Sequence, residues 1–483
     1  RETPICLVRR YESVSPLALE NIERMAPSSI GCSLKKLDLS DTGLINILPK
    51  LRIHEDSEVE EFKLAASKEE YITEILEQEK TICVGRVETM ELKEYAVSVI
   101  TKMRLEDCGV GDLSLIATRK EHITEILKQE KPFCVGRVTR VHFYKYAVGS
   151  ITEMSREDCE VEYLSLNASK EEYITEILKQ EKPFCVGRVK TMELGDYAVG
   201  VIAKMSLEDC GVEYLRLSAS KEEHVAAVLK QEKPFCVGRV KKMWLLGYAV
   251  GVITKMSLED CGVEHLVLAA YKKEEIASVL EQEKPFCVGR VKTMELGYYA
   301  VGAITRISLK DCEIEYLSLI ASEEAHVAEV LKQENPFCVG RVKNMRFEEY
   351  AVGVITKMSL KDCEIGRLVL DATGREHVAE VLKQEKPFCV GRVKKMKLTG
   401  YAASVITKMT IHEDNTMAEF DLRGREDHLC RILKEGDNSI NLGRIRTGGL
   451  RVPEEIKRKL RYTLVDGEGR EVLEEENDEE ERF

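Results

Sequence analysis

The chain contains sixteen cysteines, and their regular spacing is the first feature that could support chemistry. From Cys83 to Cys389 the intervals alternate between 25 and 26 residues. No C-x-x-C pair of the kind used for zinc or for a redox-active disulfide is present. We therefore expect buried structural thiols, with a ladder of disulfides between neighbouring segments as the alternative. Because every cysteine in this range belongs to a repeated framework, none is marked as a catalytic nucleophile.

Acid–base chemistry is the second candidate. Glu91, His142 and Glu193 follow one another at intervals of 51 residues. If each interval crosses two strands, the two carboxylates lie about 19 Å apart, whereas glycosidase carboxylates lie about 5–9.5 Å apart. We interpret these residues as a solvated face and expect no enzymatic activity, no cofactor and no metal. One position of the repeat holds a histidine in four copies: His122, His224, His326 and His377. Other copies have Tyr71, Tyr173 or Glu275 there, so we predict that these histidines lie on the surface at the start of a helix.

Composition narrows the class of protein. The net charge of −13 argues against a general nucleic-acid-binding surface. The chain contains no run of about 18 apolar residues, so we expect no membrane insertion. Regularly spaced cysteines without C-x-x-C pairs favour a cytoplasmic location. The glycosylation sequon at Asn167 keeps an extracellular location as the alternative. The first residue is Arg1 rather than methionine, so we expect a processed product or a fragment of a longer protein.

A repeat of 51 residues must position these side chains. The segment PFCVGR recurs with its cysteine at 134, 185, 236, 287, 338 and 389, and TICVGR is a less exact copy at Cys83. Each unit has a 23-residue half, such as Val189–Gly211, and a 28-residue half, such as Val212–Arg239. Both halves open with V-x-x-[LM]-x-L, whose alternating apolar residues predict a strand, and continue with a helix-like pattern. Such units bury their apolar faces only against their neighbours.

These motifs resemble the leucine-rich repeat L-x-x-L-x-L-x-x-N/C-x-L. The clearest match is LKKLDLSDTGL, with Leu34, Leu37, Leu39, Thr42 and Leu44. A second frame through Ile202, Met205, Leu207, Cys210 and Val212 also fits, which leaves the strand register of the 23-residue half open. The 28-residue half is similar to the ribonuclease-inhibitor and NOD-like-receptor type. The resemblance implies an α/β fold, a curved leucine-rich-repeat solenoid with a parallel concave sheet and 51-residue double repeats (28 + 23).

Four segments follow from this pattern. Residues 1–33 are expected to form an N-terminal cap with a helix at 15–25, and residues 34–447 an array of about 16–17 coils. LGRIRT at 442–447 would be the last coil of that array. Residues 448–464 are expected to form a C-terminal cap with a helix at 453–461, in which Pro453 takes the first helical position. Residues 465–483 are rich in acid and are expected to be a disordered tail.

Outward positions of the motif differ between copies, whereas KQEKPFCVGRV hardly changes. Lysines at the second motif position, such as Lys241, alternate with glutamates, such as Glu213, and predict a cross-strand ladder of charges. The only tryptophan, Trp244, falls on the varying face, and tryptophan and arginine are enriched at interface hot spots. We expect a partner-binding surface on the concave face made of these residues: Trp244, Tyr214, Arg216, His265, Tyr298, Arg346, Leu246, Glu193 and Glu295.

The expected function is protein–protein recognition by this concave face, with a protein ligand whose identity the sequence does not give. The resemblance implies the ligand-sensing part of a larger intracellular immune-type receptor of innate immunity. The alternative is a free-standing inhibitor or effector protein that wraps a partner enzyme. Neutral drift of solvated residues is the alternative explanation of this variation. Drift does not explain why the exposed KQEK segment stays uniform, whereas gene conversion or recent duplication would.

Overall fold

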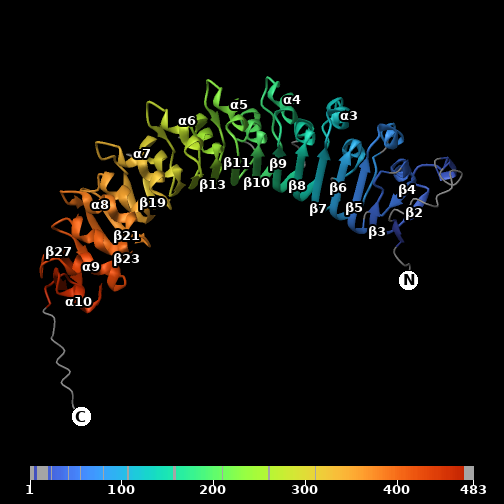
Figure 1. The fold of residues 1–483 in the computed structure, drawn as a ribbon. Coiled ribbons are helices and arrows are strands. Elements are labelled where there is room, and N and C mark those ends of the chain that lie inside the picture. Colours follow the sequence, from blue (N-terminus) through green and yellow to red (C-terminus); the bar gives the residue numbers. More distant parts are fainter. Residues whose placement is uncertain are drawn as a thin grey trace, which may run out of the picture. The chain divides into compact units, whose positions relative to one another are not determined.

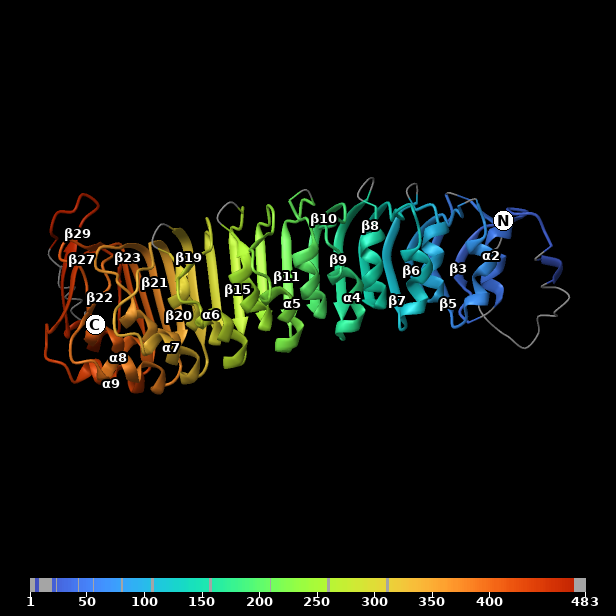
Figure 2. The same ribbon diagram turned by 90° about the horizontal axis from the view of Figure 1, so that it is seen from above.

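A computed structural model describes residues 5–7, 20–22, 24–41, 43–54, 56–79, 81–105, 108–155, 159–208, 210–258, 261–309 and 312–472. The chain divides into two compact units, Arg1–Ser257 and Leu258–Phe483. Each unit is an α/β repeat solenoid in which most strands belong to one large parallel sheet, as expected, with small separate sheets beside it (Figure 1). In each unit the strands line one side and short helices cover the other, so that the core lies between them (Figures 1 and 2).

The sheet of the first unit follows the chain order, with each strand hydrogen-bonded to the next. Its strands are β1 (Ile5–Leu7), β3 (Leu34–Asp38), β5 (Glu58–Ala66), β6 (Arg86–Glu94), β7 (Val110–Ala117), β8 (Arg137–Lys145), β9 (Glu160–Ala168), β10 (Arg188–Asp196), β11 (Tyr214–Ala219) and β13 (Lys242–Gly247). Behind them lie the 3₁₀ helices η2 (Gly43–Lys50), η4 (Tyr95–Lys102), η6 (Tyr146–Glu153), η8 (Tyr197–Lys204) and η10 (Tyr248–Lys255). These alternate with the α-helices α2 (Thr73–Leu76), α3 (Thr124–Leu127), α4 (Thr175–Leu178) and α5 (Ala226–Leu229).

The second unit repeats this plan. Its sheet contains β15 (His265–Ala270), β17 (Thr293–Tyr298), β19 (Glu313–Ala321), β20 (Arg341–Glu349), β21 (Glu364–Ala372), β23 (Arg392–Gly400), β26 (Glu419–Arg423) and β28 (Leu450–Arg451). Its helices are η12 (Tyr299–Arg306), η14 (Tyr350–Lys357), η16 (Tyr401–Lys408), α6 (Ala277–Leu280), α7 (Ala328–Leu331), α8 (Ala379–Lys383), α9 (Glu426–Leu433) and α10 (Glu454–Lys457).

Strand register follows the fourth position of the motif. Met192 pairs with Leu164 on one side and Leu215 on the other, and Leu215 pairs with Met243. All four side chains are fully buried, because alternate residues of a strand point to the same face. The second frame is therefore wrong, since Met205 directly follows the 3₁₀ helix η8 and forms an isolated bridge with Phe184 rather than a strand of the main sheet.

The uniform PFCVGR segment has packing reasons for its sequence. Its glycine adopts a positive φ, as at Gly340 (φ +65), where an added Cβ would lie 2.1 Å from the carbonyl oxygen of Leu309. The preceding glutamine caps its short helix, since Gln129 Nε2 donates to the carbonyl of Glu125 at 3.2 Å. Both contacts are made with main-chain atoms, so they constrain the sequence of every copy.

The two ends of the chain differ from expectation. Within 15–25, Glu20–Ile22 are helical, and residues 15–19 and 23 lie outside the described residues. The strand that extends the main sheet after β26 is β28. Residues 442–446 of LGRIRT lie instead in β27 (Ile440–Arg446), which belongs to a separate sheet with β25 (Thr416–Met417) and β29 (Leu460–Val465). Helix α10 begins at Glu454, one residue after Pro453, and the chain re-enters a strand at Leu460.

Of the expected tail, residues 465–472 form a turn that closes on β29. The amide of Val472 donates to the carbonyl of Leu464 at 2.9 Å, and Val465 forms an antiparallel bridge with Glu471. Residues 473–483 lie outside the described residues. Residues 465–472, which were expected to belong to a disordered tail, are therefore ordered against β29.

Candidate interaction surface on the sheet

The outward residues of the first unit form a row across the sheet, one residue per strand. The strand register places His142, Ser165, Glu193, Arg216 and Trp244 side by side on β8, β9, β10, β11 and β13. The residues before and after each of them in the strand point into the core. These residues occupy the fifth position of the V-x-x-[LM]-x-L motif, which varies between copies of the repeat.

Trp244 is held by aromatic and cationic neighbours. Its ring packs edge-on against Tyr214 with 5.7 Å between centroids, and the guanidinium of Arg216 lies 5.9 Å from the indole centroid. Trp244 is nevertheless 36% exposed. A large apolar ring that is positioned by neighbours yet open to solvent is typical of an interface anchor.

Arg216 continues the network toward the N-terminal strands. Its Nε lies 3.6 Å from a carboxylate oxygen of Glu193, and Glu193 also accepts a hydrogen bond from the hydroxyl of Tyr163. Burial, together with this bond, raises the pKa of Tyr163 to about 12, and burial raises that of Tyr214. Both tyrosines therefore remain protonated donors throughout the physiological range.

His142 closes the other end of the row. Its ring stacks on Tyr144 (6.1 Å between centroids, 11° between planes) and tilts against Tyr163 at 5.7 Å. Its Nε2 lies 3.6 Å from Asp112, which also accepts a hydrogen bond from Arg140 Nε at 3.0 Å. Burial lowers the pKa of His142 despite Asp112, so the imidazole is neutral at pH 7. We call the connected residues Asp112, Arg140, His142, Tyr144, Tyr163, Glu193, Tyr214, Arg216 and Trp244 the sheet-face cluster.

The structure divides the residues predicted for the binding surface. Glu193, Tyr214, Arg216 and Trp244 belong to the sheet-face cluster, and Leu246 lies half-buried on the same strand as Trp244. His265, Glu295, Tyr298 and Arg346 lie in the second unit, on β15, β17 and β20. The sequence did not single out four residues of the cluster: Asp112, Arg140, Tyr144 and Tyr163. Of these, Asp112, Arg140 and Tyr163 occupy the third position of the V-x-x-[LM]-x-L motif, which varies between copies as the fifth position does.

Within the second unit, the predicted residues do not form one cluster. Tyr298 ends β17 with φ +58 and packs against Tyr271 (4.8 Å) and His326 (5.6 Å). Arg346 forms an ion pair with Glu348 on its own strand. Glu295 faces Val267 and Ser318 across the sheet. Tyr271 is 59% exposed, the largest exposure among the large hydrophobic side chains that the structure describes.

The histidines predicted to lie on the surface are buried instead. His122, His224 and His326 are at most 5% exposed, and the side chain of His377 is 11% exposed. Each packs on the tyrosine that begins the preceding 3₁₀ helix, as His122 does on Tyr95 at 4.6 Å. The prediction was wrong because a polar residue in a helix-start position was read without the aromatic side chain of the neighbouring coil.

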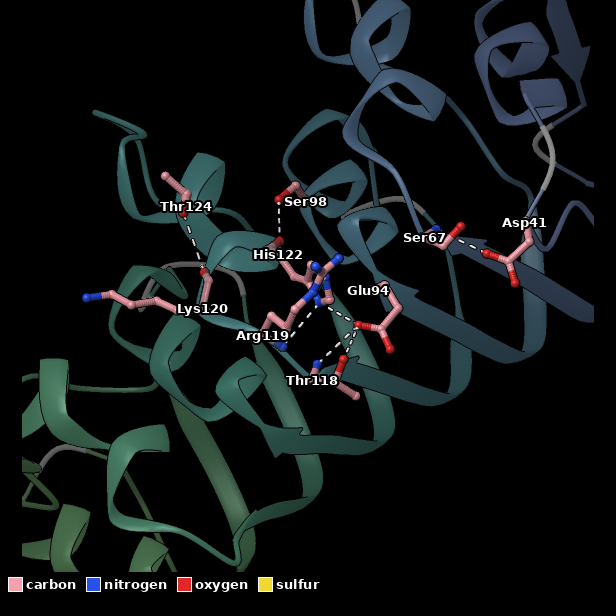
Figure 3. Close-up of polar contacts among 9 residues, drawn as sticks. All are labelled: Asp41, Ser67, Glu94, Ser98, Thr118, Arg119, Lys120, His122 and Thr124. Carbon is pink, nitrogen blue, oxygen red and sulfur yellow. Dashed lines mark hydrogen bonds and ion pairs between the residues drawn. The ribbon is translucent and has the colours of Figure 1, made fainter.

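Around His122, polar groups of two coils meet at the carboxyl ends of the strands (Figure 3). Glu94, with φ +57, accepts bonds from the amide and hydroxyl of Thr118 at 3.2 and 2.6 Å. His122 Nδ1 lies 2.5 Å from the same carboxylate, and Arg119 Nε donates to His122 Nε2 at 3.1 Å. Asp196 and Glu349 hold the next coil through Ser220 and Thr373 in the same way. These hydrogen bonds link each coil to the next.

The cross-strand ladder of charges is confirmed. Lys241 pairs with Glu213 at 2.9 Å, and Lys343 with Glu315 at 3.4 Å. All these side chains are about half exposed or more, so each pair contributes little to stability.

Glu91, His142 and Glu193 lie on β6, β8 and β10, with β7 and β9 between them. Among the described residues, no group of three or more His, Cys, Asp or Glu side chains is placed to hold a metal ion. No helix in the described part of the chain is long and apolar enough to cross a membrane.

The fold defines a class of protein: a repeat solenoid built on a parallel sheet with a varying outward face. No protein-family model matches the sequence, and no curated protein sequence matches it.

Proposed function

We propose that the outward face of the sheet recognises a protein partner, with Trp244 and Arg216 as its centre. The observation that supports this most is the sheet-face cluster, in which the exposed indole of Trp244 packs against Tyr214 and lies close to Arg216. Interface hot spots are enriched in tryptophan, tyrosine and arginine, and preorganised side chains lose little entropy on binding.

The variation between copies supports the same proposal. Inward residues of each strand are buried and similar in every copy, while the outward row changes from Glu91 to His142 to Trp244. A partner that contacts several strands would meet a different side chain on each. Drift of solvated residues predicts the same variation, and what favours recognition is the exposed indole of Trp244 beside Tyr214 and Arg216.

The resemblance to leucine-rich repeats, particularly of the ribonuclease-inhibitor and NOD-like-receptor type, extends the proposal. On that basis the chain is the ligand-sensing part of a larger intracellular immune-type receptor. A free-standing inhibitor or effector that wraps a partner enzyme is the second candidate. A nucleotide-binding module encoded upstream of Arg1 would favour the receptor, and its absence from the full-length gene would favour the inhibitor.

Affinity purification with quantitative mass spectrometry tests the proposal. The baits are the natural chain, Trp244→Ala, and Tyr271→Ala as a matched control that also removes an exposed aromatic ring. We expect a partner that the natural chain and Tyr271→Ala capture equally, and that Trp244→Ala binds at least about 30-fold more weakly, or about 2 kcal/mol. Equal binding by Trp244→Ala in a direct affinity measurement would refute a site centred on this residue.

A further inference from the structure

The cysteines lie in two kinds of position at the amino ends of the strands. The outer cysteine belongs to CVGR and precedes its strand by a few residues, and the inner cysteine follows 25 residues later, before the next strand. Outer cysteines are half-buried or exposed, as at Cys185 and Cys338, whereas inner ones such as Cys210 are mostly buried. The expectation of uniformly buried thiols is therefore wrong for the outer positions.

Outer and inner sulfurs of successive coils approach each other closely. The Sγ–Sγ distance is 3.2 Å between Cys134 and Cys159 and 3.0 Å between Cys185 and Cys210. A disulfide bond is about 2.05 Å long, so closure needs a movement of about 1 Å. The two cysteines of a pair precede their strands by different numbers of residues, yet the intervening segments bring both sulfurs together.

Fixed contacts orient the outer sulfur. The amide of the glycine two residues later donates to it, at 3.3 Å from Gly136 to Cys134 and at 3.5 Å from Gly340 to Cys338. In the second unit the inner thiol of Cys363 donates to the carbonyl of Gly340 at 3.8 Å, beside the outer cysteine. Packing alone does not explain an outer thiol that is partly exposed yet aimed at a second thiol.

We propose that these cysteines form dithiol pairs that are oxidised to disulfides between successive coils. The pairs are Cys83 with Cys108, Cys134 with Cys159, Cys185 with Cys210, Cys287 with Cys312, and Cys338 with Cys363. The oxidant is a low-molecular-weight disulfide such as oxidised glutathione. The proposal is independent of the partner-binding site.

The reaction proceeds in two exchanges. The accessible outer thiol loses its proton and attacks one sulfur of oxidised glutathione, which gives a mixed disulfide and releases one glutathione. The inner thiol then loses its proton and attacks the outer sulfur, and the second glutathione leaves. Two electrons pass from the pair to the oxidant, and the two protons end on the two glutathione molecules.

The order of attack follows from burial. Burial, with a contribution from Cys83, raises the pKa of Cys108 to about 11, so this inner thiol is protonated at neutral pH. Burial also raises the pKa of Cys363. The inner thiol therefore reacts second, as the resolving group. An exposed outer cysteine beside a resolving cysteine is the usual arrangement of a redox-sensitive site.

Peptide mapping of the full chain tests the proposal, because three pairs yield unique tryptic peptides. TICVGR pairs with LEDCGVGDLSLIATR, EEIASVLEQEKPFCVGR with DCEIEYLSLIASEEAHVAEVLK, and QENPFCVGR with DCEIGR. The chain is incubated with oxidised glutathione until Cys430, an exposed cysteine outside the paired spacing, has reacted fully; remaining thiols are then alkylated. We expect the three cross-linked peptide pairs without retained glutathione, and glutathione on EDHLCR.

Two variants sharpen the experiment. Cys108→Ser removes the resolving thiol, so Cys83 should retain glutathione while the other pairs still close. Asn415→Cys should create a new link to Cys389, because the amide of Asn415 donates to the carbonyl three residues earlier, as that of the inner Cys363 does. The buried Asn415 side chain hydrogen-bonds both main-chain groups of Val393, four residues after Cys389, and the substitution replaces those bonds. Glutathione retained on Cys83, Cys287 and Cys338 in the natural chain, or thiols there that remain alkylatable after Cys430 has reacted, would overturn the proposal.

Discussion

Replacing Val240 by aspartate tests the packing of the repeat most directly. Val240 is fully buried at the entry to β13, where the motif places its first apolar residue. Removing the buried side chain costs about 1.5–3 kcal/mol. An unpaired buried carboxyl group has its pKa raised by up to about 3–5 units, each worth about 1.4 kcal/mol, which adds about 4–7 kcal/mol. The sum of about 6–10 kcal/mol rivals the whole stability of a typical domain.

The expected result is loss of the coils around β13 rather than a small shift in stability. Hydrogen exchange should show β11 and β13 unprotected while β5 and β6 stay protected, since each coil is stabilised mainly by its neighbours. Val267→Asp is the matched control, because Val267 points outward between Leu266 and Leu268 and should change the free energy of unfolding by about 1 kcal/mol or less.

The pH dependence of the variant gives a second check. The folded-state pKa of the new aspartate is raised, so the penalty applies above its usual pKa and shrinks as the pH falls toward about 4. Part of the lost protection in β11 and β13 should then return. Equal urea midpoints for Val240→Asp and Val267→Asp would refute the assignment of inward and outward faces.

Two further predictions concern backbone strain and a buried phenol. Gly340→Ala should lower the free energy of unfolding by more than the about 1–2 kcal/mol that a left-handed alanine costs, because its added Cβ also meets the carbonyl of Leu309. Gly211→Ala is the control, since Gly211 has φ +67 and an added Cβ there would have nothing within 4 Å. Urea titrations of Gly211→Ala should therefore show the backbone cost alone. The pKa of Tyr163 is raised to about 12, so its contribution to stability is complete below pH 10 and is lost as the pH rises toward 12. The urea midpoint should therefore fall less for Tyr163→Phe than for the natural chain between pH 9.5 and pH 11.5, and parallel losses would contradict the assignment.

Alternating apolar residues predicted the strands, and the resemblance to leucine-rich repeats implied their parallel order. The register of the 23-residue half was fixed only by the strand pairs of Met192 with Leu164 and Leu215; a slip by one residue would turn Met192 and Leu194 toward solvent. The helix type was beyond the reach of the pattern, since the apolar residues of YAVGVITK suit a 3₁₀ helix as well as an α-helix. The buried histidines and the approach of Cys185 to Cys210 depend on contacts between coils. Spacing along one coil contains no information about these contacts.

The candidate site was predicted in part for the same reason. Trp244 and Arg216 stood out by residue type, whereas Tyr163 gained its role only when the register set it beside Glu193. His265, Glu295, Tyr298 and Arg346 were grouped with Trp244 by position in the repeat. The structure describes them in a second unit, where Tyr298 instead contacts Tyr271 and His326.

The distribution of uniform and varying residues has a physical explanation in this fold. Gly340 and its copies approach main-chain oxygens of the neighbouring coil so closely that a side chain there would clash, and glutamines such as Gln129 bind main-chain carbonyls of their own short helices, so these positions are constrained. Outward residues of the strands meet only one another and solvent. A change at one of them alters the surface without a cost in packing, and the contacts of Arg216 with Glu193 and Trp244 show that adjacent outward residues still form ordered clusters. One scaffold can therefore carry a different recognition surface on each stretch of its sheet, which is what binding to a large, uneven protein surface requires.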